Sequence, residues 1–179
     1  MAETPTTTLW LGRAMFLGLA LVLMFLQLVP LNMEPGGLVA PDLLLAVTVA
    51  WIARRPDYAP FYVIAAIYLL SDLLFQRPPG LWAALVLIMT EMLRARTKRI
   101  RDMPILLEWG SVAVGIAAIT LANRIVLAIV MMPQAPLGLT LILMLTTIAV
   151  YPVVVLVAHF LFGVTRTAPG AVDSLGHRL

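Results

Sequence analysis

The sequence predicts an all-α integral membrane protein with about six transmembrane helices in one compact bundle. Hydrophobic residues make up 62% of the chain and charged residues 12%, and the mean hydropathy is +1.02. Soluble domains carry roughly 25% charged residues, so this chain has too little polar surface to face water on all sides. Its apolar residues form long runs between short polar gaps, and no run has the sustained polar face of a soluble amphipathic helix. These observations argue against a soluble helical bundle.

Six apolar runs predict the six spans. They cover residues 12–31, 38–53, 59–75, 79–93, 105–132 and 137–163. Because a hydrocarbon core of ~30 Å takes about 20 helical residues to cross, the three middle runs are short. The second and fourth reach only about 24 Å, so they either recruit flanking residues, thin the bilayer locally or do not span fully. Pro152, inside the sixth run, predicts a kink there.

The spans define one membrane domain, 10–166, between flexible cytoplasmic tails at 1–9 and 167–179. Among the 12 Lys and Arg residues, Arg124 lies inside a span and Arg77 alone lies in the gaps after the first, third and fifth spans. All the others fall on the opposite side, which the positive-inside rule assigns to the cytoplasm. Both termini are therefore predicted inside. The net charge of +3 marks topology, and we expect no nucleic-acid partner.

The gap after the fourth span is a cytoplasmic basic loop. Its cations are Arg94, Arg96, Lys98, Arg99 and Arg101. Beyond orienting the chain, such a loop can attract anionic lipid at about 1 kcal/mol per residue. It can also dock an acidic partner. The sequence leaves these roles open, with the topology signal as the simplest.

Ionisable residues in or beside the spans form a polar cluster at the outer side, because the topology and the helical rise bring them to one depth. The cluster comprises Asp42, Asp72, Arg77 and Arg124. Asp42 follows Pro41 at a helix start, where a carboxylate satisfies free N–H groups. Asp72 lies near a helix C-terminus, where the helix dipole disfavours an anion. We therefore expect Asp72 to form a buried pair with Arg77 or Arg124, and the cluster to be structural or part of a partner surface.

Small residues recur along the fifth span at four-residue spacing, which lets another helix approach closely. They are Ser111, Gly115, Ala118 and Ala122. The pattern predicts a helix-packing face. The approaching helix belongs either to this chain or to a partner.

Few residues could carry chemistry. The chain has no cysteine, His159 and His177 are isolated, and no HExxH, G-x-S-x-G, P-loop or dinucleotide-binding motif is present. Glu91 lies three residues before Arg94 and can pair with it along the helix, and Glu108 is expected to balance charge at a helix end. We expect no catalytic residue, no cofactor and no metal, and hence no enzyme.

Several segments resemble, in order and spacing, those of the rod shape-determining protein MreD family, particularly its alphaproteobacterial branch. They are APDLLLAVTVAW (40–51), ARRPDYAP (53–60), LLSDLLF (69–75), PPGLWAALVL (78–87) and LTTIAVYPVV (145–154), with the basic gap in its expected place. The resemblance covers most of the chain. None of these segments is diagnostic alone; their order in a chain this short carries the resemblance.

The resemblance implies a non-enzymatic, multi-pass scaffold of the bacterial cell inner membrane. Family members belong to the rod complex, or elongasome. They are thought to bind MreC and to help couple MreB filaments to peptidoglycan synthesis by RodA and a class B penicillin-binding protein, and so to rod cell shape. Their fold is considered similar to the substrate-binding components of energy-coupling-factor transporters. By position, Asp42 and Asp72 match the family's recurrent aspartates. That fold similarity also suggests the alternative, a substrate-binding component for vitamin or small-solute uptake.

Overall fold

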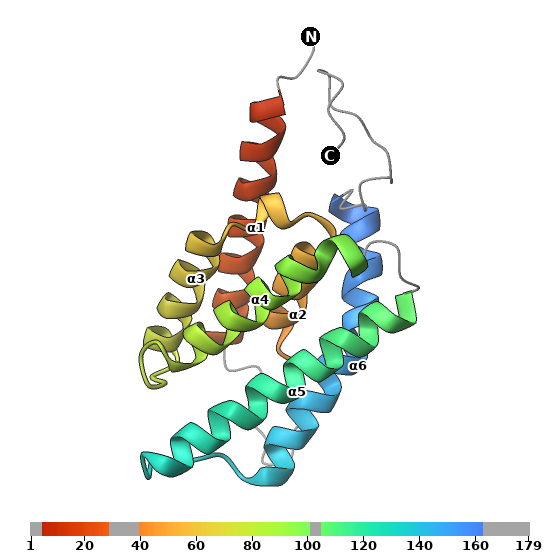
Figure 1. The fold of residues 1–179 in the computed structure, drawn as a ribbon. Coiled ribbons are helices and arrows are strands. Elements are labelled where there is room, and N and C mark those ends of the chain that lie inside the picture. Colours follow the sequence, from red (N-terminus) through yellow and green to blue (C-terminus); the bar gives the residue numbers. More distant parts are fainter. Residues whose placement is uncertain (1–4, 29–39, 101–104, 163–179) are drawn as a thin grey trace.

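A computed structural model of the chain describes residues 5–28, 40–100 and 105–162 (Figure 1). Within these ranges the chain is all-helical, as predicted, with six α-helices and one short 3-10 helix, η1. In chain order they are α1 (Pro5–Leu28), α2 (Leu43–Arg54), η1 (Pro56–Tyr58), α3 (Phe61–Leu74), α4 (Leu81–Ile100), α5 (Ile105–Ile129) and α6 (Leu137–Phe162).

Each predicted apolar run corresponds to one helix, and the two largest boundary differences are at the start of α1 and the end of α4. The start of α1 at Pro5 places residues 5–9, predicted as part of a flexible tail, in a helix. Helix α4 continues to Ile100, so the predicted basic loop is helical as far as the structure describes it. Lys and Arg are good helix formers, which explains why the helix does not stop where the apolar run stops. Arg101 and the predicted tail 167–179 lie outside the described residues.

Helix α2 is buried along its whole length. Every residue from Leu44 to Arg54 is buried, and the helix packs against α1, α4 and α6. Thr48, a polar side chain in the middle of this helix, donates a hydrogen bond to the Leu44 carbonyl at 2.8 Å and accepts one from the Tyr68 hydroxyl at 3.1 Å. A helix that is apolar all round belongs in a protein interior. Because protein surrounds it, α2 need not match the bilayer thickness, although it is only about 18 Å long.

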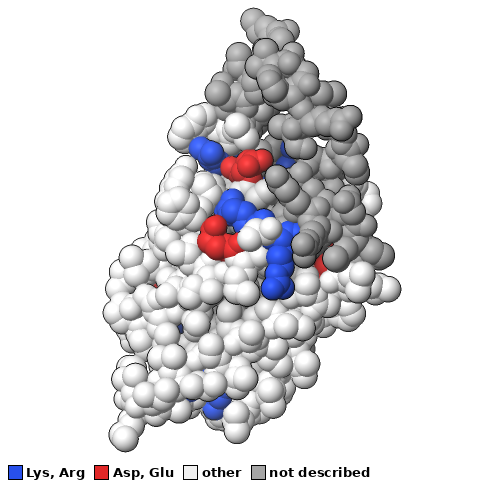
Figure 2. Space-filling view, viewed as in Figure 1, with Lys and Arg blue, Asp and Glu red and all other residues white. Residues whose placement is uncertain are grey.

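Three other helices are long and apolar enough to cross a bilayer, which indicates a membrane protein. They are Thr7–Leu28, Leu106–Ile129 and Leu137–Phe160. Their outer faces expose large apolar side chains, including Phe25, Val114 and Phe160. Soluble monomers rarely expose contiguous apolar patches beyond a few hundred Å². Figure 2 shows charged side chains gathered in the upper half of one face, above a broad surface that is almost free of charge.

Successive helices run in opposite directions, so the helix termini lie at two opposite ends of the structure (Figure 1). The two ends carry different side chains. At the basic end α2 finishes at Arg54, α4 finishes at Ile100 after a segment that carries Arg94 and Arg96, and α5 begins. At the opposite end, the cavity end, α2 and α4 begin and α5 passes through a turn into α6.

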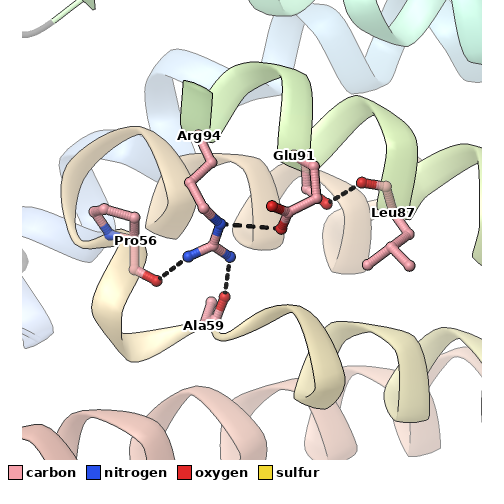
Figure 3. A network of polar contacts seen from close by, with 6 residues as sticks. Pro56, Ala59, Leu87, Glu91 and Arg94 are labelled. Carbon is pink, nitrogen blue, oxygen red and sulfur yellow. Dashed lines mark hydrogen bonds and ion pairs between the residues drawn. The ribbon is translucent and has the colours of Figure 1, made fainter. Parts of the chain in front are cut away.

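Arg94 fastens the turn between α2 and α3 to α4 at the basic end (Figure 3). Its Nη1 and Nη2 atoms donate to the carbonyls of Pro56 and Ala59 at 2.7 and 2.6 Å. Its Nε atom donates to Glu91 at 3.0 Å, which confirms the predicted pair along the helix. Three charge-assisted hydrogen bonds fix the guanidinium. Arg94 is therefore a structural clamp as well as part of the basic segment.

Helix α1 approaches the same turn closely because it carries a glycine there. A Cβ added to Gly12 would lie 2.6 Å from three carbons of the Tyr58 ring. The neighbouring Arg13 donates from Nε to the Asp57 carbonyl at 3.2 Å. The ring of Tyr58 thus packs directly on the α1 backbone, and any larger residue at position 12 must displace one of them.

Pro152 lies inside α6 and cannot donate a hydrogen bond to the carbonyl four residues earlier. That carbonyl belongs to Ile148, and it accepts instead from the Trp109 indole Nε1–H of α5 at 2.9 Å. Few groups can hydrogen-bond such a carbonyl in an apolar environment. The α5 indole therefore compensates for the missing donor and ties α5 to α6. The predicted kink at Pro152 stays a prediction.

Candidate functional site at the cavity end

Asp42 caps the buried helix α2. Its Oδ1 atom accepts from the Leu45 N–H at 2.9 Å, as expected for a carboxylate at the N-cap. Its own N–H donates to the Thr147 hydroxyl of α6 at 2.9 Å. The predicted capping role is confirmed. The second contact, which attaches the start of α2 to α6, could not be seen from local sequence.

Asp72 is fully buried and caps a helix other than its own. Its Oδ2 atom accepts from the backbone N–H groups of Gly80 at 3.0 Å and Ala83 at 3.1 Å, at the N-terminus of α4. The turn that makes this possible has positive φ at Gln76 (52°) and Gly80 (87°). A carboxylate stabilises a helix N-terminus through its free N–H groups and its dipole.

The expected buried pair between Asp72 and an arginine is wrong. Neither Arg77 nor Arg124 forms an ion pair with Asp72, although all three lie in the described part of the chain. The physical reason is that the α4 N-terminus offers two N–H donors directly to the carboxylate. The sequence did indicate that α4 needs a capping group from elsewhere in the chain. The stretch Pro78-Pro79-Gly80 that leads into α4 lacks a Ser, Thr, Asp or Asn to cap it.

Arg124 is held by the turn between α5 and α6. Its Nη1 atom donates to the Ala135 carbonyl at 3.0 Å and to the Thr140 hydroxyl at 2.7 Å. The Gln134 amide donates back to the Arg124 carbonyl at 3.1 Å. These contacts fix the guanidinium near the end of α5 without a carboxylate partner.

Arg77 lies over aromatic rings. Its guanidinium carbon is 5.2 Å from the centre of the Phe75 ring and 5.9 Å from the centre of the Trp82 ring. Cation–π contacts at these distances contribute roughly 0.5–1 kcal/mol at exposed sites. The side chain itself is exposed. Aromatic contacts therefore position a cation that forms no ion pair with any carboxylate in the described part of the chain.

An open cavity of about 540 Å³ brings most of the predicted cluster together. Asp42, Arg77 and Arg124 line it, whereas Asp72 does not. Helices α2, α4, α5 and α6 all contribute to its walls, which carry further polar groups and a large apolar area. Its volume lies within the roughly 300–1,000 Å³ of small-molecule sites. Asp72 acts on this cavity indirectly, because it fixes the start of α4, whose first residues line it.

A second polar group, at the basic end, was missed from the sequence. Arg54 donates to Glu108 Oε1 at 2.7 Å, and the Tyr151 hydroxyl donates to the same oxygen at 2.6 Å. All three side chains are buried. From the sequence, Arg54 was one of the cations that mark the cytoplasmic side, and Glu108 was expected to balance charge at a helix end. Both residues were predicted at the cytoplasmic side of the membrane, so the depth argument used for the outer cluster would have paired them.

The small residues predicted to form one helix-packing face of α5 have different surroundings in the structure. Gly115 packs against α4, because a Cβ added there would lie 2.8 Å from the Met89 methyl carbon. Ser111 donates to the Glu108 carbonyl within its own helix. Ala118 is exposed, and Ser111 and Ala122 are half-buried. Close approach within the chain is therefore seen at Gly115.

No group of three or more His, Asp or Glu side chains that could hold a metal ion occurs among residues 5–28, 40–100 and 105–162. Comparison of the chain with protein-family models, curated proteins and solved structures gave no match.

Proposed function

We propose that this chain is a non-enzymatic membrane scaffold of the bacterial rod complex, which binds MreC and helps couple MreB filaments to peptidoglycan synthesis. The proposal rests on the ordered resemblance to the MreD family. The energy-coupling-factor-like fold is part of the same proposal.

The structural observation that supports the proposal is the role of the polar groups in the segments that resemble the MreD family. Asp42 and Asp72 each cap a helix, and the turn of the ARRPDYAP segment is held by Arg94. The segment 40–51 forms most of the buried helix α2. The residues on which the resemblance depends therefore hold helices in place. Such a use suits a protein whose task is to present a fixed surface to partners.

We propose further that both termini and the basic end face the cytoplasm. The cations at the ends of α2 and α4 support this orientation. Fusions of alkaline phosphatase, which is active only in the periplasm, and of green fluorescent protein test it. After residue 179 we expect fluorescence without phosphatase activity. In the 133–136 turn between α5 and α6 we expect the reverse, and the opposite pattern would contradict the orientation.

The functional experiment is affinity purification of the chain from native membranes under gentle conditions, followed by mass spectrometry. Recovery of MreC together with RodA or a class B penicillin-binding protein is the expected result. A matched purification of an unrelated multi-pass membrane protein controls for carry-over. Recovery of a coupling protein with ATPases, and of no peptidoglycan synthase, would contradict the scaffold.

The open cavity favours one second candidate, a substrate-binding component for uptake of a vitamin or small solute. Its volume and mixed polar and apolar walls suit a small organic ligand. Co-purification of such a solute with coupling ATPases would support this candidate in place of the scaffold.

A further inference from the structure

The cavity end holds guanidinium donors to which no residue in the described part of the chain bonds. Arg124 donates both of its hydrogen bonds through Nη1, and its Nε and Nη2 atoms bond to no other described residue. The guanidinium of Arg77 makes cation–π contacts but no hydrogen bond or ion pair with the described residues. Both side chains line the same open cavity. Two cations thus face one space with most of their donors available.

The described side chains that line the cavity carry a net positive charge. Asp42 is the one carboxylate among the described lining residues, against the two arginines. Its Oδ1 atom already accepts from the Leu45 N–H, and the carboxylate faces the positive end of the α2 dipole. Among the described lining residues, one positive charge therefore remains uncompensated. A cation beside a hydrocarbon environment is costly, and a bound anion would offset that cost.

Much of the cavity wall is apolar. The apolar lining residues include Leu45, Ile116, Leu143 and Met144, from three different helices. An inorganic anion would leave this surface without a partner. A ligand that joins an anionic group to a hydrocarbon chain would contact both the arginine side chains and the apolar walls. Guanidinium groups bind phosphate oxygens through paired, directed hydrogen bonds, which makes phosphate the anion that two arginines suit best.

We propose that the cavity binds the head group of a phosphate-bearing lipid between Arg77 and Arg124, with the first part of its hydrocarbon chain along the apolar wall. The site does not depend on the scaffold role, because it rests on the cavity alone. It differs from the exposed position of Arg96 at the basic end in having walls from four helices.

Native mass spectrometry of the detergent-purified protein, titrated with phosphatidylglycerol, tests this site. Arg77→Gln removes one cation without loss of a hydrogen bond within the described protein. Arg124→Gln removes the other. One charge-assisted hydrogen bond corresponds to about a tenfold change in affinity, so each variant should weaken the first binding event about tenfold. The control, Arg96→Gln, removes the same charge from an exposed position at the basic end and should leave that event within about twofold.

Four comparisons decide the outcome. Equal weakening by the cavity variants and the control would overturn the site, since it would indicate general attraction of lipid to cations. Diacylglycerol, which lacks the phosphate, should not compete with phosphatidylglycerol, and competition would overturn the phosphate assignment. Glycerol phosphate and inorganic phosphate should bind at least about tenfold more weakly, because they lack the hydrocarbon chain. Equal binding would overturn the lipid assignment. Arg124→Lys, which keeps the charge, should retain part of the affinity if Arg124→Gln acts on binding and not on folding.

Discussion

The hydrogen bond from Trp109 to the Ile148 carbonyl should matter only because residue 152 is proline. Trp109→Phe removes the indole donor while keeping an aromatic ring. In the native background this change leaves the carbonyl without a donor, because Pro152 has no N–H. In a Pro152→Ala background the new backbone N–H can bond to the same carbonyl. The two substitutions should therefore be coupled.

The magnitude follows from the geometry. The bond is 2.9 Å long and its donor lies on an exposed face of α5, so its strength should be that of an interhelical bond in a membrane. Such bonds average about 0.6 kcal/mol and reach about 1.7 kcal/mol. We expect a coupling free energy of about 1 kcal/mol. The loss of ring area on Trp→Phe is common to both backgrounds and cancels in the cycle.

The assay is reversible unfolding by sodium dodecyl sulfate in mixed micelles, with the free energy of unfolding measured for the four proteins of the cycle. A parallel cycle with Val153→Ala, an exposed residue one position on, should give no coupling. If Trp109→Phe costs the same in the native and in the Pro152→Ala background, within about 0.3 kcal/mol, the compensation is refuted.

Three further substitutions test the packing contacts by the same unfolding assay or by crosslinking. Asp72→Ala should lower the free energy of unfolding by about 2–3 kcal/mol, because two helix N–H groups lose a charged acceptor. The control Asp57→Ala, at an exposed position, should change the free energy of unfolding by under about 0.5 kcal/mol. Equal effects of the two substitutions would contradict the cap. Glu108→Gln should cost about 3–5 kcal/mol, because it leaves the buried arginine uncompensated, and a cost below about 1 kcal/mol would contradict the ion pair. Gly12→Val should reduce disulfide crosslinking between cysteines introduced into α1 and η1, since its side chain meets the Tyr58 ring, and unchanged crosslinking would contradict that contact.

The helices could be predicted because their signal is local. Apolar runs mark all six, and Asp42 after a proline marks the start of α2. The end of α4 could not be placed, since hydropathy falls at Arg94 while helix propensity does not. Apolar run length also gave no sign that α2 is buried on all sides. That property depends on the arrangement of its neighbours.

The polar contacts were harder to predict because they join distant segments. Asp72 bonds to residues eight and eleven positions later, and Arg54 bonds to Glu108 across 54 positions. Depth alone placed Asp72 near Arg77 and Arg124. It could not rank those cations against the free N–H groups at the start of α4, which donate to the Asp72 carboxylate. The missing cap at the start of α4 was the available signal.

Depletion of this chain in its native bacterium, with cell width followed by microscopy and solute uptake measured in the same cells, tests the proposed scaffold most directly. We expect the rods to widen and become round while uptake per unit of membrane is unchanged, and we expect expression of the chain to restore the rod. Cells that keep their width but lose uptake of a vitamin or small solute would contradict the scaffold and support the transport role.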